Sequence, residues 1–143
     1  MTTLTAGSPT ADSGESRNVG SVKALYLALT DRDLPGVQRL LVEDPVWDIA
    51  PGSPDGGVYR GMAEVFGGFY PKLAARFHSF EVVPDTFVDG GDRVVVVGHY
   101  RVAESDGAES RLVRFTHVFG IAAEGRIKGV WQVADTALLN ETA

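Results

Sequence analysis

The sequence predicts an α+β domain: a curved mixed or antiparallel sheet wrapped around three N-terminal helices, forming a conical pocket. Helical periodicity is confined to the first half of the chain, and the second half carries strand-like runs. Three of these runs, at 92–102, 111–119 and 125–134, are joined by short turn-rich segments, a pattern typical of an antiparallel meander. A length of 143 residues fits one domain, predicted over 18–143 after a disordered tail over 1–17.

Two helices are expected first. Val22, Leu25, Tyr26 and Leu29 form an apolar stripe that predicts a helix over 18–30. Its candidate N-caps are Ser16, Asn18 and Ser21. A second helix is expected from Asp33, as its cap, through Leu41, because Pro35 is tolerated in a first helical turn.

A short strand is expected over 45–50, followed by a loop rich in Gly and Pro over 51–57. Residues 60–77 are helical in period, with a kink predicted near Pro71 because that residue cannot donate to the carbonyl of Gly67. The run 79–88 reads as a strand, and Pro84 within it indicates a sheet edge or a bulge.

The run 111–119 places a histidine in the middle of an apolar strand face. Val113, Phe115, His117 and Phe119 alternate onto this face. Burial and polar neighbours tune the pKa of an imidazole in such a place, so His117 is the first candidate for catalysis. A satisfied core histidine is the alternative interpretation.

Three other segments carry candidate site residues. Asp48 follows Trp47, and a carboxyl buried beside an indole would be a general acid or base; strand alternation equally permits Asp48 to face solvent. His99 and Arg101 share a face with Val95 and Val97, and a pocket arginine would suit a carboxylate or enolate oxygen. Periodicity alone points Trp131 inward rather than Gln132.

Composition excludes several classes of function. The net charge of −6, without a basic stripe, argues against binding nucleic acid. The chain has no cysteine, and its three histidines lack metal-ligand spacing, so no metal site is expected. There is no phosphate loop, no serine-nucleophile elbow, no signal peptide and no membrane-spanning run. A cytoplasmic location and no membrane partner are therefore expected.

Three motifs resemble the SnoaL-like, ketosteroid-isomerase-like branch of the nuclear transport factor 2 superfamily. They are Trp47-x-x-x-Pro51-Gly52 with Tyr59-Arg60-Gly61, the strand entry at 91–96, and the ending Gly125-Arg126-Ile127 with 131–137. The resemblance covers roughly 19–139. It implies the fold predicted above, with an apolar outer sheet face that packs against a second copy in a homodimer.

The resemblance also locates functional positions. The oxyanion-binding aspartic acid of ketosteroid isomerases corresponds to His117, their tyrosine falls next to Tyr26, and their base falls next to Asp48. The Asp-Arg-Asp set of limonene-epoxide-hydrolase relatives corresponds approximately to Arg101, His99 and Gln132, and points Gln132 inward. None of these positions carries the family's own residue, so the reaction does not transfer directly.

The resulting hypothesis is an enzyme without a cofactor that acts on a small hydrophobic, polyketide-like substrate by general acid/base chemistry. Its reaction would be a cyclisation, an isomerisation, or a hydration or dehydration. His117, Asp48 and His99 are the catalytic candidates. The substrate-binding candidates are Tyr26, Trp47, Phe66, Tyr70, Arg101, Phe115 and Gln132. Two alternatives stay open: an epoxide hydrolase or cyclase of polyether type, and a module that binds a ligand without catalysis.

Overall fold

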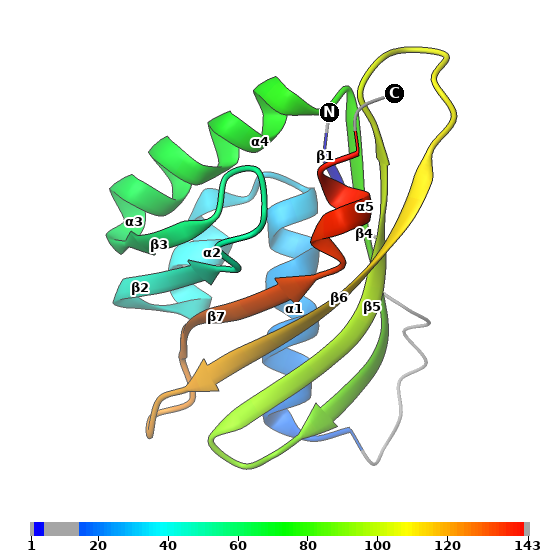
Figure 1. The fold of residues 1–143 in the computed structure, drawn as a ribbon. Coiled ribbons are helices and arrows are strands. Elements are labelled where there is room, and N and C mark those ends of the chain that lie inside the picture. The colour runs from blue at the N-terminus through cyan, green and yellow to red at the C-terminus, as the bar shows by residue number, and fades with distance from the viewer. Residues whose placement is uncertain (1, 5–14, 142–143) are drawn as a thin grey trace.

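The computed structural model of the chain describes residues 2–4 and 15–141 and shows one curved sheet flanked by helices (Figure 1). The sheet has seven strands in the order β1-β4-β5-β6-β7-β2-β3. Their bounds are β1 (Thr2–Leu4), β2 (Leu41–Ile49), β3 (Gly57–Arg60), β4 (Ser79–Asp89), β5 (Arg93–Ala103), β6 (Arg111–Ile121) and β7 (Ile127–Ala134). The predicted fold class is confirmed.

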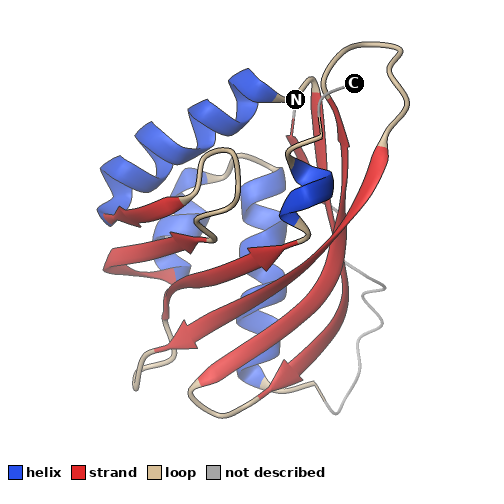
Figure 2. Ribbon diagram, viewed as in Figure 1, coloured by secondary structure: helices blue, strands red, loops and turns tan. Residues whose placement is uncertain are grey.

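The two first helices begin and end close to where the sequence predicts. α1 spans Arg17–Thr30, and the Ser16 side chain caps it by accepting from the Val19 N–H. α2 spans Leu34–Leu40, and Asp33 caps it by accepting from the Gly36 N–H. Figures 1 and 2 show α1 lying across one face of the curved sheet, so its apolar stripe is buried against the strands.

The helix expected over 60–77 has three parts. α3 (Gly61–Glu64) continues into a π-helical segment, η1 (Val65–Phe69), and then into α4 (Tyr70–Arg76). The irregularity therefore lies where Pro71 removes a backbone donor, and it takes the form of a π-helical segment where the sequence predicted a kink. A final short helix, α5 (Thr136–Leu139), follows β7.

Strands β4 to β7 form the predicted antiparallel meander. The register of β4 against β5 shifts between Pro84 and Thr86, which is the irregularity expected at Pro84. β2 pairs parallel with β7 and antiparallel with β3, so the sheet is mixed. The inward face of β6 is the predicted one, because Val113, Phe115, His117 and Phe119 are all buried.

Four elements differ from the sequence predictions, and one of them is α5, where no helix was expected. β2 begins at Leu41 rather than Pro45, and β3 lies where a loop was expected to lead directly into a helix. β1 pairs parallel with β4 inside the stretch for which a disordered tail is predicted. The rest of that tail up to residue 14 lies outside the described residues. Within the described chain, no helix is long and apolar enough to cross a bilayer.

Candidate active site

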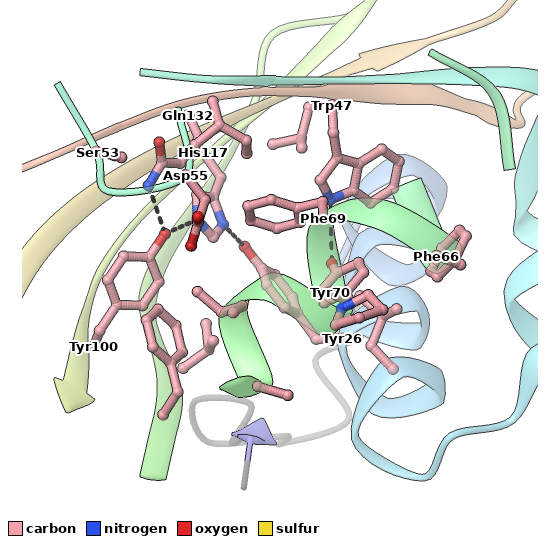
Figure 3. Close-up of a pocket in the computed structure, with 18 of the residues that line it drawn as sticks. Tyr26, Trp47, Ser53, Asp55, Phe66, Phe69, Tyr70, Tyr100, His117 and Gln132 are labelled. Carbon is pink, nitrogen blue, oxygen red and sulfur yellow. Dashed lines mark hydrogen bonds between the residues drawn. The ribbon is translucent and has the colours of Figure 1, made fainter. Parts of the chain in front are cut away.

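A cavity of about 570 Å³ lies between the helices and the inner face of the sheet (Figure 3). Most of its lining is apolar or aromatic. The lining residues of interest for chemistry are Tyr26, Trp47, Ser53, Asp55, Phe66, Phe69, Tyr70, Tyr100, His117, Phe119 and Gln132. A largely apolar cavity with a few polar groups is the usual form of a small-molecule site.

His117 lies at the polar end of this cavity, and both of its ring nitrogens are occupied. The Tyr26 hydroxyl lies 2.7 Å from Nδ1, and the Tyr100 hydroxyl lies 2.7 Å from Nε2. Tyr26 comes from α1, whereas Tyr100 comes from β5, the neighbour of the histidine's own strand β6. The imidazole is thus clamped between a helix and a strand (Figure 3).

Gln132 extends the chain of hydrogen bonds by one member. Its Nε2 donates to the Tyr100 hydroxyl over 3.1 Å, and its Oε1 accepts from the Ala50 N–H over 3.1 Å. The amide orientation is fixed by this backbone donor, because an N–H requires the amide oxygen to face it. Gln132 therefore presents a donor to Tyr100.

Burial holds these groups in their neutral forms. Loss of hydration lowers the pKa of His117 from 6.5 to about 3, because the imidazolium form would be stranded among aromatic carbons. Burial also raises the pKa of the Tyr26 and Tyr100 hydroxyls above the ordinary value. At neutral pH the three groups form an uncharged set.

The proton count in this set leaves one hydroxyl proton for the cavity. A neutral imidazole donates through one nitrogen and accepts through the other. If Nε2 donates to Tyr100, then Tyr26 donates to Nδ1, and the Tyr100 proton is free to point elsewhere. If Nδ1 donates to Tyr26, the roles are exchanged. Either tautomer presents one tyrosine O–H donor to a ligand, and the two tautomers differ in which tyrosine presents it.

Aromatic rings line much of the remaining wall. The Trp47 Nε1–H donates to the Tyr70 hydroxyl over 3.1 Å, and the Phe66 ring stacks on the Tyr70 ring. The pKa of Tyr70 is raised by burial to about 12, so its hydroxyl also stays protonated. Tyr26, Trp47, Phe66, Tyr70 and Gln132 all reach the cavity, and these are positions that the sequence predicts. Phe115 is buried directly behind His117 rather than on the cavity wall.

Asp48, His99 and Arg101 are not on the cavity wall, so the structure does not support the roles predicted for them. Strand alternation explains all three, since Trp47 and Ile49 are buried on β2 and turn Asp48 to the opposite face. On β5, burial of Tyr100 turns His99 and Arg101 outward. There the His99 Nδ1 lies 3.3 Å from Asp85, and Arg101 lies 3.8 Å from Glu81.

Gln132 faces inward and Trp131 outward, which decides between the two orientations that the sequence left open. Gln132 is buried, whereas half of the Trp131 surface is exposed. The family resemblance predicted this arrangement, and periodicity alone predicted the opposite one.

Three functional candidates were missed from the sequence: Tyr100, Ser53 and Asp55. Tyr100 shares its face with Val94, Val96 and Val102, which are fully buried. The other face of β5 carries Arg93, His99 and Arg101 beside Val95 and Val97, so it is the more polar face, and this difference could have identified Tyr100 as inward-facing. Ser53 and Asp55 lie in an irregular loop, where periodicity gives no orientation.

The described residues offer no ready metal site. Within 2–4 and 15–141, no three His, Asp or Glu side chains lie close enough together to share an ion. Hydrogen bonding and proton transfer are the chemistry that the described groups themselves supply.

Comparison with known proteins identifies the family. A model of the SnoaL-like domain matches residues 22–130. The chain belongs to the SnoaL-like domain family. No match was found among curated proteins.

Solved structures of relatives share the fold along nearly their whole length. A protein of the nuclear transport factor 2-like group from Burkholderia pseudomallei, of unknown function, is 30% identical, with a TM-score of 0.76 over 87% of this chain and 95% of that one. TerC, co-crystallised with polyporic acid, is 24% identical (TM-score 0.75; 87% and 96% covered). A putative SnoaL-like polyketide cyclase from Jannaschia is 17% identical (TM-score 0.73; 93% and 95% covered).

Proposed function

We propose that this SnoaL-like protein is an enzyme that performs acid/base chemistry, with no cofactor, on a hydrophobic, carbonyl-bearing, polyketide-like intermediate. The reaction would be a ring closure, a double-bond shift or a dehydration. The observation that carries the proposal is the His117 imidazole held at 2.7 Å on both nitrogens by two tyrosine hydroxyls that reach an apolar cavity.

The proposed mechanism is a proton relay that creates no charged side chain. In one tautomer, Tyr26 gives its hydroxyl proton to a substrate carbonyl oxygen and takes the Nδ1 proton of His117. At the same time Nε2 takes the Tyr100 proton, and the Tyr100 oxygen takes a proton from the carbon beside that carbonyl, so the ketone becomes its enol. One proton enters the substrate and one leaves it, and the imidazole ends as its other tautomer.

The low pKa of His117 favours this relay over direct acid catalysis by an imidazolium. With a pKa of about 3, the ring carries no charge at neutral pH, so it is not itself a proton donor of the imidazolium type. In the relay the neutral imidazole gives up the proton on one nitrogen and gains one on the other, so no charged side chain forms. This matters because a charge is costly in a site that excludes water. The tyrosine hydroxyls then make the direct contacts, and His117 connects them.

The nature of the cavity supports the proposed substrate class. The aromatic wall suits flat, unsaturated molecules, and the uncharged O–H donor suits a carbonyl or enol oxygen. Two proteins with the same fold are described with compounds of this kind: one is named a putative SnoaL-like polyketide cyclase, and TerC was co-crystallised with polyporic acid. Polyporic acid is therefore a direct binding probe for this cavity.

The test measures proton exchange rather than a guessed physiological turnover. β-Tetralone carries acidic protons beside its carbonyl, and their replacement by deuterium in D₂O is followed by NMR. We expect the wild type to accelerate exchange, and His117→Gln and Tyr26→Phe to lower the acceleration about a hundredfold, within the range of general acid/base contributions. Binding of polyporic acid or β-tetralone with no acceleration would contradict catalysis and favour the ligand-binding module.

A further inference from the structure

Ser53 carries a polar atom that the protein itself does not use. Its hydroxyl oxygen is buried and has no hydrogen-bond partner among the described residues, although the side chain is on the cavity wall. Only 9% of the residue is exposed. A buried hydroxyl without a partner costs free energy, so its presence on a cavity wall indicates a partner that arrives with the ligand.

Asp55, two residues along the same loop, adds unused acceptor capacity. Its two carboxylate oxygens accept from Arg76 Nε at 2.9 Å and Nη2 at 3.0 Å, and 10% of its side chain is exposed. A carboxylate has about four acceptor positions, so this ion pair leaves about two unused. Among the described cavity-lining residues, Asp55 is the sole carboxylate.

The loop that carries both residues is tied down from several sides. The Ser53 N–H donates to Ala50 O over 2.9 Å, and the Tyr59 hydroxyl donates to Asp55 O over 2.7 Å. From the other side, Asn140 Nδ2 donates to Gly52 O over 2.6 Å. The loop therefore presents Ser53 and Asp55 to the cavity in a fixed arrangement, as a pre-formed binding site requires.

We infer that Ser53 and Asp55 form a second polar subsite, which binds a hydroxyl group of the ligand; the inference rests on the proposed function of the cavity. A phenol or enol hydroxyl of the ligand donates to a carboxylate oxygen of Asp55 and accepts from the Ser53 hydroxyl, so it supplies a hydrogen-bond partner to both side chains. Arg76 already balances the charge of Asp55, so the subsite requires no cationic group on the ligand and suits a neutral hydroxyl. The substrate class is therefore a hydroxylated aromatic or enolic ketone, with its carbonyl at the end formed by Tyr26, His117 and Tyr100.

The experiment compares flavone, a planar aryl ketone, with the series of monohydroxyflavones and their methyl ethers. Dissociation constants come from titration against the intrinsic fluorescence of the protein. We expect at least one hydroxyflavone to bind the wild type about tenfold more tightly than flavone, as a hydrogen bond to a charged acceptor allows, and its methyl ether to show no gain. Ser53→Ala and Asp55→Asn should each reduce the hydroxyflavone-to-flavone affinity ratio toward one.

Arg76→Met is the matched control for Asp55→Asn, because it removes the same ion pair but keeps the carboxylate. The affinity ratio should fall further in Asp55→Asn than in Arg76→Met. Equal falls, or hydroxyflavones no tighter than flavone in the wild type, would overturn the subsite while leaving the proposed function standing. No binding by flavone or any derivative would overturn both.

Discussion

The rings of Phe115 and His117 lie face to face, with their centroids 3.9 Å apart and their planes inclined by 19°. The two residues are two positions apart on β6, so strand alternation places them side by side on the inner face. The phenyl ring covers one face of the imidazole and excludes water from it. This contact is part of the burial that lowers the pKa of His117.

Gly98 makes room for this stack, which leads to a prediction about stability. A Cβ at Gly98 would lie 2.3 Å from Val83 O and 2.8 Å from Phe115 Cζ, so Gly98→Ala forces β4 and the phenyl ring to move. We expect the free energy of unfolding to fall by about 1–3 kcal/mol, as in other overpacked cores. Urea denaturation measures the change.

Gly120→Ala is the matched control on β6. Its Cβ would meet Lys128 Cβ at 3.6 Å, which is an ordinary contact. If Gly98→Ala were as stable as Gly120→Ala, the close packing of Phe115 against Gly98 would be contradicted.

The lowered pKa of His117 predicts an acid-sensitive fold. In the unfolded chain the imidazole titrates near its ordinary 6.5, whereas in the folded chain the pKa is about 3. Between these values the unfolded state binds the extra proton, so stability is fully present above the unfolded pKa and falls as the pH is lowered. We expect a slope of up to about 1.4 kcal/mol per pH unit from this residue alone.

Urea denaturation of the wild type and His117→Gln across about pH 7 to 4 tests that expectation, because the ordinary pKa lies inside this window. The variant should lose less stability on acidification than the wild type. Parallel losses would show that His117 is not the group responsible. The same pKa predicts that titration of His117 does not change the rate of catalysis between about pH 5 and 8. If a protonated His117 were the catalytic acid, the rate would change in that range.

Removing the Tyr100 hydroxyl should harm both stability and activity. Tyr100→Phe keeps the ring, which stacks on Phe115 at a centroid distance of 4.5 Å. It leaves His117 Nε2 and Gln132 Nε2 buried without that partner, at a cost of about 1–3 kcal/mol. We also expect β-tetralone exchange to fall about a hundredfold, since the relay loses one end.

Tyr70→Phe controls for the loss of a buried hydroxyl. The Tyr70 hydroxyl accepts from Trp47 and makes no hydrogen bond to His117. Its removal should affect exchange much less than Tyr100→Phe does. Equal losses of activity in the two variants would contradict the relay and indicate a general effect on the cavity.

The sequence predicted the core of the site from β6 and failed on its neighbours, for a physical reason. On β6 one face is rich in aromatic residues and the other carries Arg114 and Thr116, so alternation fixes the direction of His117. On β5 the contrast between the two faces is weaker, because Val95 and Val97 share a face with His99, and these valines led the prediction to the wrong side although Arg93 and Arg101 make that face the more polar one. The packing of β4, β5 and β6 places Tyr100 toward the helices.

The sequence did not predict the side-chain directions in the loop after β2, for a different reason. Ser53 and Asp55 are positioned by contacts with Tyr59, Arg76 and Asn140, which are distant in sequence or lie in other elements. No local pattern encodes such contacts. A Gly- and Pro-rich composition predicts that a loop exists, without predicting which side chains it turns inward.

The outer face of the sheet carries the last prediction, a homodimer. Val95, Val118 and Trp131 are cross-strand neighbours on β5, β6 and β7 and form an apolar row on this face. Half of the Trp131 surface is exposed, and Val97 and Leu112 are also exposed. Burying such a row against its symmetric copy removes apolar surface from water, which is the main favourable term in association.

Trp131→Lys should therefore shift the protein from dimer to monomer, because the dimer would bury an ammonium group against its copy. Light scattering after size-exclusion chromatography measures the molar mass. Leu27→Lys is the control, since Leu27 is equally exposed but lies on α1, away from the outer sheet face. A monomeric wild type, or a dimer that survives Trp131→Lys, would contradict dimerisation through this face.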